Sequence, residues 1–241
     1  MRSTAEGAGD GSLPFDLRGE RLQLLPERAL WWPAQGALLV ADVHIGKAAA
    51  FRALGLPVPT GTTMANLQRL ETLLRRLRAS RLFVLGDFLH APQARSPAVL
   101  AALAAWRARL AGVDCVVVEG NHDRHAGRLP DALGIELVCG SLEFGDFLLS
   151  HGDRGHPASA PGQEGPYVLA GHLHPAYVLR GRAGERLRLP CFVFGAHQGI
   201  LPAFGEFTGS LTVGSSPSER VFVVGDGRVW RVPPPPAALD R

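Results

Sequence analysis

The chain has 241 residues, of which 46 % are hydrophobic and 20 % are charged, and its formal net charge is +3 at pH 7. These proportions are ordinary for a soluble globular protein, and the small positive charge permits a nucleic-acid ligand without arguing strongly for one. No apolar run reaches the roughly 18 residues of a membrane span, and the polar N-terminus lacks the apolar segment of a secretory signal, so we expect a cytoplasmic protein with no membrane partner.

The two ends of the chain differ in composition from the rest. We expect residues 1–13 to form a disordered tail, residues 14–231 to form a single domain, and the proline-rich residues 232–241 to form a loose C-terminal tail. The three cysteines, Cys115, Cys139 and Cys191, lie in apolar stretches without a Cys-x-x-Cys pair. They are therefore expected to be buried, reduced thiols without a disulfide or metal role.

Short runs rich in Val, Leu and Phe predict buried strands. In chain order they are Ala37–Ala41, Leu82–Leu85, Val116–Val118, Phe147–Leu149, Val168–Ala170, Cys191–Phe194 and Val221–Val224. From Val168 onward the helical patterns stop and short strands with glycine turns dominate. The sequence therefore predicts an α/β protein of two packed sheets with helices on the outer faces, in one domain.

Two amphipathic helices are predicted between the early strands. The first has Thr62 or Thr63 as its N-cap, and the second has Ser96 as N-cap with Pro97 at its first position. Apolar residues recur at helical spacing in both and predict the buried stripes. These residues are Met64, Leu67, Leu70, Leu74 and Leu77 in the first helix and Leu100, Leu103 and Leu110 in the second.

Five apolar runs are each followed by Asp, Asn or His. The five clusters are Asp42-Val43-His44, Gly86-Asp87, Gly120-Asn121-His122-Asp123, His151 and Gly171-His172-Leu173-His174. Because sites in open α/β sheets form at the carboxyl ends of the strands, we expect all five at one rim. Side chains two residues apart in an extended segment point the same way, so Asp42 and His44 are expected to reach one ion, and His172 and His174 repeat that spacing.

These side chains offer nitrogen and oxygen ligands and no sulfur. Such a donor set favours Mn, Fe or Zn bound without thiolate. Each cluster alone is commonly an ordinary loop or turn, but five together indicate two metal ions, and two-metal sites hydrolyse phosphate esters. Asn121 contributes a carbonyl oxygen, which is a neutral ligand.

In this order the motifs resemble the signature of the calcineurin-like metallophosphoesterases, over residues from about 38 to 175. The resemblance implies a four-layer αββα sandwich with two mixed sheets, and a catalytic role for His122. Asp123 stands where many relatives have Glu, and two roles stay open for it: orienting His122 or capping the turn. The implied ligands of one divalent metal are Asp42, His44, Asp87 and His174, and Asp87 bridges to a second metal held by Asn121, His151 and His172.

A narrower branch, the bacterial ligase-associated DNA damage response endonucleases, is similar over residues from about 20 to 231. The stretches that carry this resemblance are Leu24–Ala29, Leu39–Lys47, Gly86–His90 and Pro202–Gly209. That resemblance implies a Mn-dependent phosphodiesterase or endonuclease acting on DNA in repair. The implied partners are a DNA ligase, a helicase and an exonuclease-like protein. The ligands alone leave two enzyme alternatives open, a small-molecule phosphatase and a cyclic-nucleotide phosphodiesterase. A non-catalytic scaffold is a third alternative, against which the complete set of ligands argues.

Residues outside the clusters are candidates for substrate binding. Lys47 follows the first cluster closely, and His90 lies three residues after Asp87. Arginines alternate with leucines around a turn at Ala183-Gly184, which predicts a β-hairpin with one basic and one apolar face. A basic ribbon of this kind can follow a DNA backbone, although an ordinary solvent-exposed hairpin is the alternative. The arginines are Arg180, Arg182, Arg186 and Arg188.

Overall fold

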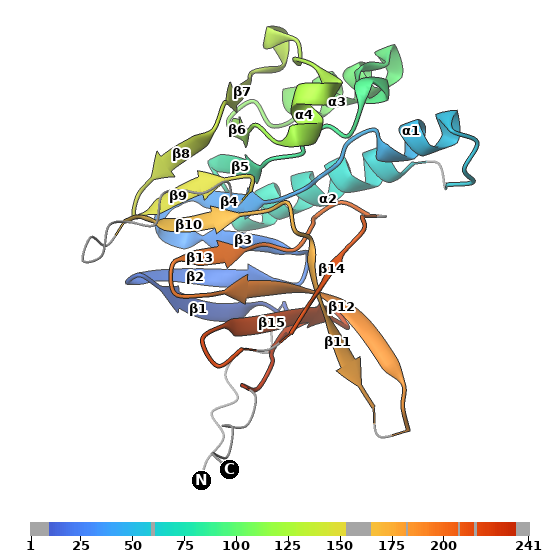
Figure 1. Ribbon diagram of the computed structural model, residues 1–241. Helices are drawn as coiled ribbons and strands as arrows, with labels where there is room; N and C mark the ends of the chain where they lie inside the picture. The colour runs from blue at the N-terminus through green and yellow to red at the C-terminus, as the bar shows by residue number, and fades with distance from the viewer. Residues whose placement is uncertain are drawn as a thin grey trace, which may run out of the picture.

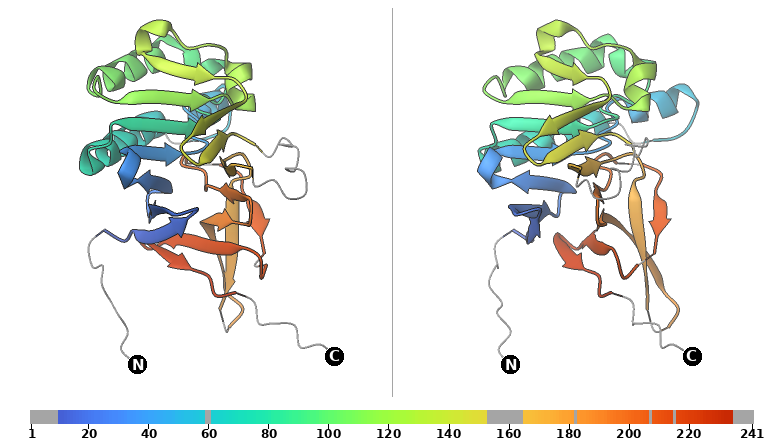
Figure 2. Two further views of the ribbon diagram at one scale, coloured as in Figure 1. Left: turned by 90° about the vertical axis from the view of Figure 1, so that its left-hand side faces the viewer. Right: turned by 60° about the vertical axis from the view of Figure 1, so that its left-hand side comes forward.

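The structure, a computed structural model, describes residues 10–58, 61–152, 165–181, 183–206, 208–214 and 216–234. Two mixed β-sheets pack against each other, and the described helices cover the outer face of the first sheet (Figure 1, Figure 2). The two packed mixed sheets are those that the sequence predicts, whereas within the described residues the helices lie on the outer face of the first sheet alone. Within the described residues no helix follows β9, which matches the change of pattern in the second half of the sequence.

The first sheet has seven strands whose spatial order equals their order in the chain. The strands from β1 to β4 pair antiparallel, and those from β4 to β7 pair parallel. The carboxyl ends of β4, β5 and β6 therefore lie next to one another at one edge of the sheet. The seven are β1 (Leu13–Leu17), β2 (Glu20–Leu25), β3 (Ala29–Trp32), β4 (Ala37–Val40), β5 (Arg81–Leu85), β6 (Asp114–Val118) and β7 (Ile135–Val138).

The second sheet is built from the C-terminal half of the chain. Its main path runs in the order β14-β11-β12-β13-β10-β9-β8, with β15 paired to β12 and β16 paired to β15. Strand β10 is parallel to both β9 and β13. Its strands are β8 (Ser141–Phe144), β9 (Phe147–Ser150), β10 (Tyr167–Ala170), β11 (Pro175–Arg180), β12 (Arg186–Phe194), β13 (Gln198–Ile200), β14 (Leu211–Val213), β15 (Arg220–Gly225) and β16 (Arg228–Arg231).

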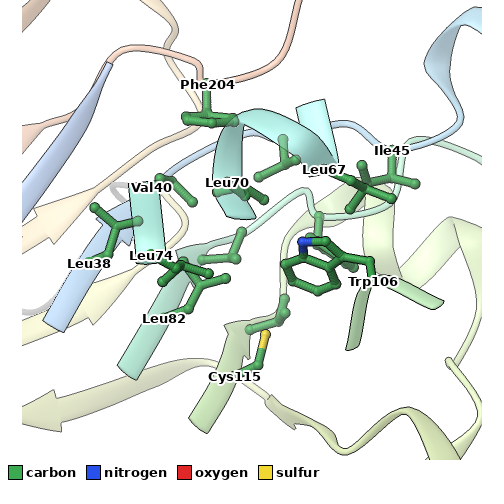
Figure 3. Close-up of a cluster of buried hydrophobic side chains, with 14 of the residues drawn as sticks. Leu38, Val40, Ile45, Leu67, Leu70, Leu74, Leu82, Trp106, Cys115 and Phe204 are labelled. Carbon is green, nitrogen blue, oxygen red and sulfur yellow. The ribbon is translucent and has the colours of Figure 1, made fainter. Parts of the chain in front are cut away.

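Two hydrophobic layers hold this arrangement. Between the sheets, aromatic rings from both sides meet: Phe15 packs on Phe194 at 4.3 Å and Trp32 on Phe147 at 4.9 Å between ring centroids. Between the first sheet and the helices lies a second layer (Figure 3). The helices are α1 (Lys47–Ala53), α2 (Thr62–Leu77), α3 (Pro97–Ala108) and α4 (Asn121–Ala126), with 3-10 turns at Pro33–Gln35, Pro92–Arg95 and Asp131–Leu133.

The start of α2 differs from the prediction. Gly61 occupies the N-cap, and the hydroxyl of Thr63 instead accepts a hydrogen bond from the backbone N–H of Gly46 at 3.2 Å. Met64 is 50 % exposed, because Asn66 takes the buried position there and donates its side-chain amide to the Val43 carbonyl at 3.2 Å. Leucines further along α2 pack against the first sheet as predicted (Figure 3). In α3, Ser96 is the N-cap residue and Pro97 begins the helix, as predicted.

Two further predictions concern the ends of the chain and the cysteines. Residues 1–9 and 235–241 of the expected tails lie outside the described residues, whereas the Gly11 carbonyl accepts a hydrogen bond from Val229 N–H at 3.0 Å. Cys115 and Cys191 are buried free thiols, but Cys139 is exposed because it lies in the turn between β7 and β8 rather than in a strand.

None of the helices described here is both long and apolar enough to cross a membrane.

Candidate metal centre

The predicted rim exists, and it is built from both sheets. In the first sheet, Asp42, Asp87 and Asn121 follow the carboxyl ends of β4, β5 and β6. In the second sheet, His151 and His172 follow the parallel strands β9 and β10. The face-to-face packing of the sheets brings all seven predicted metal ligands to one place. They are Asp42, His44, Asp87, Asn121, His151, His172 and His174.

The first ligand group consists of Asp42, His44 and His174, whose ligand atoms lie within 4.8 Å of one another. Nε2 of His174 is 3.2 Å from Oδ1 of Asp42 and 3.4 Å from Nε2 of His44. Asp42 has no solvent-exposed surface and His44 is also buried. Three side chains separated by up to 132 positions in the chain therefore point at one small volume.

The second ligand group consists of Asp87, His151 and His172, again within 4.8 Å of one another. Nε2 of His151 lies 3.4 Å from Oδ1 of Asp87, 3.1 Å from Nδ1 of His172 and 3.0 Å from Oδ1 of Asn121. The groups adjoin, because the backbone N–H of His172 donates to Oδ2 of Asp42 at 2.8 Å. His172 and His174 therefore belong to different groups, which is the division that the resemblance implies.

The backbone conformation explains this difference. Five of the nine non-glycine residues with positive φ in the described chain are predicted ligands, namely Asp42, His44, Asp87, His172 and His174, with φ between 46° and 70°. Asp42 and His44 do not have the extended backbone assumed from the sequence, because both are left-handed, yet their side chains still belong to the same group. Such conformations are costly for residues with a Cβ and persist where surrounding contacts hold them. Here Asp42 N–H donates to the Gly86 carbonyl and His44 N–H to the Asp87 carbonyl, at 3.1 and 2.9 Å.

Two motif glycines leave space for the ligands. Gly86 has φ +76°, and a Cβ there would lie 2.0 Å from Nδ1 of His151. A Cβ on Gly171 would lie 2.7 Å from Oδ2 of Asp42. Both distances are shorter than any van der Waals contact, so a side chain at either position would displace a ligand of the centre.

Several ligand atoms of the centre have a lone pair available for a cation. Oδ1 of Asp42 is buried without a hydrogen-bond partner among the described residues. His151 donates Nδ1–H to the Leu85 carbonyl at 3.1 Å, and His174 donates Nδ1–H to the Gly209 carbonyl at 2.9 Å. Each bond leaves Nε2 with a lone pair facing its group, which is the orientation that supporting hydrogen bonds impose on metal-binding histidines. The nitrogen and oxygen set suits a divalent cation.

The protonation states also suit metal binding. Burial and the nearby charge of Lys47 lower the pKa of His44 to about 2, so its ring is neutral at pH 7. Burial opposes the ionisation of Asp87, but its hydrogen bond and attraction to His151 outweigh burial and lower the pKa of this carboxyl to about 2. Burial lowers the pKa of His174, but the close carboxylate of Asp42 outweighs burial and raises the pKa. A cation would replace the proton in that pair.

The predicted catalytic pair lies at the start of α4. His122 donates Nδ1–H to the His90 carbonyl at 2.7 Å, its ring stacks on the His90 ring at 4.5 Å, and its Nε2 is 4.0 Å from Oδ2 of Asp87. Asp123 does not orient His122. Its carboxylate accepts hydrogen bonds from Gly120 N–H at 2.9 Å, Leu89 N–H at 2.7 Å and Phe88 N–H at 3.3 Å. Of the two roles that the sequence leaves open for Asp123, these contacts are those of capping the turn.

The candidate substrate-binding residues lie in two places. His90 contacts the centre directly, with Nδ1 3.3 Å from Nδ1 of His44, and burial lowers its pKa to about 4. Lys47 begins α1 beside them, and burial lowers its pKa.

The arginines lie on a second feature, the hairpin of β11 and β12. This ribbon extends beyond the sandwich (Figure 1). Arg180 pairs with Arg186 and Val178 with Arg188, so the three described arginines share one face, and Arg182 lies outside the described residues.

The sequence did not single out one element of the site, the segment around Phe204 and Gly205. Phe204 N–H donates to the Ala41 carbonyl at 2.8 Å and Gly205 N–H to the Asp42 carbonyl at 3.0 Å, so the segment extends β4 at the centre. Arg28 reaches the same segment from the turn between β2 and β3. No spacing in the sequence links Arg28 to residues about 175 positions away, and only the resemblance over Pro202–Gly209 pointed to this region.

Comparison with known proteins gives three findings. A sequence profile described as calcineurin-like phosphoesterase matches residues 37–159. The chain is similar to the crystal structure of the nuclease MPE from Pseudomonas putida, with 44 % identity, a TM-score of 0.79, and an alignment that covers 92 % of this chain and 100 % of that one. No curated protein sequence matches the chain.

Two other solved structures are more distant. One is a protein of unknown function from Aquifex aeolicus, at 18 % identity and a TM-score of 0.37, over 61 % of this chain and 81 % of that one. The other is a phosphoesterase from E. coli, at 14 % identity and a TM-score of 0.37, over 79 % of this chain and 88 % of that one.

Proposed function

Because the chain belongs to the calcineurin-like phosphoesterase family, we propose that it is a two-metal phosphodiesterase that cleaves the phosphodiester bonds of DNA, in DNA repair. As a member of this family it is a hydrolase of phosphoester bonds. The observation that carries the proposal is the convergence of seven side chains from five strand ends into two adjoining ligand groups. Such a pair of sites suits in-line displacement at phosphorus.

The chain's own residues define where two divalent cations would bind. Asp42, His44 and His174 would hold one, and Asn121, His151 and His172 the other, with Asp87 positioned beside both groups. When bound, the two cations would neutralise charge on the phosphate and make a water molecule acidic enough to attack near neutral pH. We propose Mn²⁺ in both positions, since its ligand preference matches this nitrogen and oxygen set, as do those of Fe and Zn.

His122 is the proposed general acid. Because its Nδ1–H is held by the His90 carbonyl, Nε2 is the atom left to share a proton with the departing oxygen. The His122 side chain is 37 % exposed, so a substrate can reach it. Proton transfer from a positioned side chain contributes roughly 10²–10⁴-fold to the rate. The stacked ring of His90 limits the motion of His122 and adds a second imidazole beside the scissile bond.

Two features favour a polymer over a small molecule. His172 is exposed among the described residues, so the second ligand group faces solvent. The basic face of the β11–β12 ribbon begins directly after His174, and alternate residues of a strand stand about 6.6 Å apart, so Arg186 and Arg188 offer a row of charges to a polyanion. The similar Pseudomonas putida protein is a nuclease, which supports the same substrate class.

A substrate panel tests the proposal. The full chain is loaded with Mn²⁺ and assayed on bis-p-nitrophenyl phosphate, cyclic nucleotides and supercoiled plasmid. We expect hydrolysis of the generic diester and nicking of the plasmid, both abolished by EDTA. Turnover of cyclic nucleotides without nicking would favour the small-molecule alternative, and no turnover on any substrate would favour a scaffold.

A further inference from the structure

A small polar pocket lies beside the first ligand group. It has a volume of about 220 Å³, and its lining joins Arg28, His174, Arg188, Glu206 and Ser210 from three separate parts of the chain. Pockets for drug-sized ligands are larger, at roughly 300–1,000 Å³, so this one suits a single chemical group rather than a whole ligand.

The pocket shares a wall with the metal centre. His174 lines it while Nε2 of the same ring lies 3.2 Å from Oδ1 of Asp42. Ala203 and Glu206, which also line it, flank the segment in which Gly205 N–H donates to the Asp42 carbonyl at 3.0 Å. The pocket and the metal centre are therefore neighbours that share His174 and the Gly205 segment.

The one carboxylate in the lining is already engaged. Oε1 of Glu206 lies 2.7 Å from a guanidinium nitrogen of Arg69. Arg69 is fixed in turn, because its guanidinium lies 3.9 Å from the centroid of the Phe204 ring and donates a hydrogen bond to the Phe204 carbonyl. The negative charge of Glu206 is thus balanced by Arg69, and the charge of the pocket is set by the two arginines that line it, Arg28 and Arg188.

Arg28 and Arg188 retain unused donors. Among the described residues, the contacts of Arg28 are long: 3.6 Å to Oε1 of Glu206 and 3.5 Å to the Gly205 carbonyl, at or beyond the limit of a good hydrogen bond. Arg188 donates to the Ser210 carbonyl and has no ion pair with a carboxylate among the described residues. Each guanidinium carries five N–H donors in a planar fork that matches a phosphate.

From this arrangement we infer that the pocket binds the phosphodiester next to the scissile one on the same DNA strand. Arg28 and Arg188 donate hydrogen bonds to the non-bridging oxygens of this phosphodiester. The DNA strand then continues along the basic face of the β11–β12 ribbon. The inference rests on the proposed function and deepens it, because it assigns a second phosphate site that a cyclic nucleotide or phosphomonoester cannot fill.

The test compares two short competitors of bis-p-nitrophenyl phosphate hydrolysis by the Mn²⁺-loaded enzyme. Thymidylyl-thymidine has one phosphodiester, and the trinucleotide TpTpT has two. For the unmodified chain we expect TpTpT to have an inhibition constant at least about tenfold lower, as a charge-assisted contact provides. In the double variant Arg28→Gln, Arg188→Gln the two constants become equal within a factor of about two.

The exposed Arg231 on β16 offers a matched control, and Arg231→Gln should keep the tenfold ratio. A second readout needs no metal: in EDTA, binding of a fluorescent DNA 20-mer by the double variant should depend less steeply on salt. An unchanged TpTpT ratio, or an equal loss for both competitors, would overturn the inference. If neither compound competes with the unmodified enzyme while the generic diester is hydrolysed, the proposed action on DNA itself fails.

Discussion

Oδ1 of Asp87 accepts a hydrogen bond from the backbone N–H of His122 at 2.9 Å. Asp123, the residue after His122, accepts hydrogen bonds from the backbone N–H groups of Leu89 and Phe88 at 2.7 and 3.3 Å. Asp87 is the proposed bridging ligand, and His122 on α4 is the proposed general acid. The loop after β5 and the start of α4 are thus joined twice: Asp87 accepts from α4, and Asp123 of α4 accepts from the loop. The distance between metal ligand and acid is set by backbone contacts rather than by long side chains.

His122→Ala should separate proton transfer from metal binding. Since the imidazole is the proposed acid and not a ligand of either group, we expect both metals to remain and turnover on DNA to fall roughly 10²–10⁴-fold. Elemental analysis and nicking rates check this. His125→Ala, on the same short helix, is the control and should leave both quantities near their original values. Loss of a metal in His122→Ala would place this ring among the ligands, as a group with His44 and His90.

Replacing Asp123 should affect stability before chemistry. In Asp123→Ala the N–H groups of Gly120, Phe88 and Leu89 lose their acceptor, and each unsatisfied buried donor costs about 1–3 kcal/mol. We expect the Tm to fall by about 5 °C or more, since 1 kcal/mol shifts it by about 2–4 °C in a domain of this size. Asp123→Asn keeps one acceptor oxygen and should fall less. An unchanged Tm with abolished turnover would instead indicate a direct role in the reaction.

Metal should stabilise the fold. With Mn²⁺ at about 100 times the Kd of each site, each bound ion adds about 2.7 kcal/mol, which corresponds to a rise in Tm of about 5–10 °C per ion. Elemental analysis should give two ions per chain, and Asp42→Asn should lose one of them together with much of the thermal shift, because Asp42 is the buried carboxylate of the first group. Glu143→Gln, an exposed acid on β8, serves as the control. Retention of two ions by Asp42→Asn would remove this residue from the ligand set.

The outer part of the ribbon should govern the salt dependence of DNA binding. Arg180→Ser combined with Arg186→Ser removes two charges that share one face. Each phosphate contact contributes about 0.7 to the slope of log K against log salt for single strands, so we expect the slope to decrease by about 1.4. Fluorescence anisotropy over a salt series measures it. A slope equal to that of the unmodified chain would leave the ribbon without contact to DNA.

The thiols should differ in reactivity. Burial raises the pKa of Cys115 and of Cys191 to about 12, so at pH 8 only roughly one molecule in 10⁴ carries either thiolate, and the thiolate is the reactive form. Cys139 is exposed. A thiol titration with a disulfide reagent should therefore find one fast group in the folded protein and three after denaturation. Cys139→Ser should have no fast group, and a fast group that persists would mean that a buried strand opens readily.

Much of the architecture is local enough to predict. Six of the seven predicted strands lie within an observed one, and the first, Ala37–Ala41, ends one residue beyond β4. Unbroken runs of Val, Leu and Phe bounded by turns have few other stable conformations. The hairpin of β1 and β2 was missed, although Phe15 and Leu17 alternate before the Arg18-Gly19 turn, as Leu22 and Leu24 do after it. This signal is weaker because polar residues occupy the other face of each strand.

The sequence by itself determined which side chains are available for a metal centre and that they follow strand ends, because parallel strands must end at a common edge. The division of these side chains between two ions came from the family resemblance, and only the tertiary structure shows how the chain achieves it. His172 and His174 separate into two groups since both residues adopt a left-handed backbone, and that conformation is held by contacts from other strands. The capping by Asp123 depends on the pairing of β5 with β6, which brings Leu89 and Asp123 together. The pocket of Arg28 and Arg188 depends on the packing of the two sheets, because each arginine comes from a different sheet.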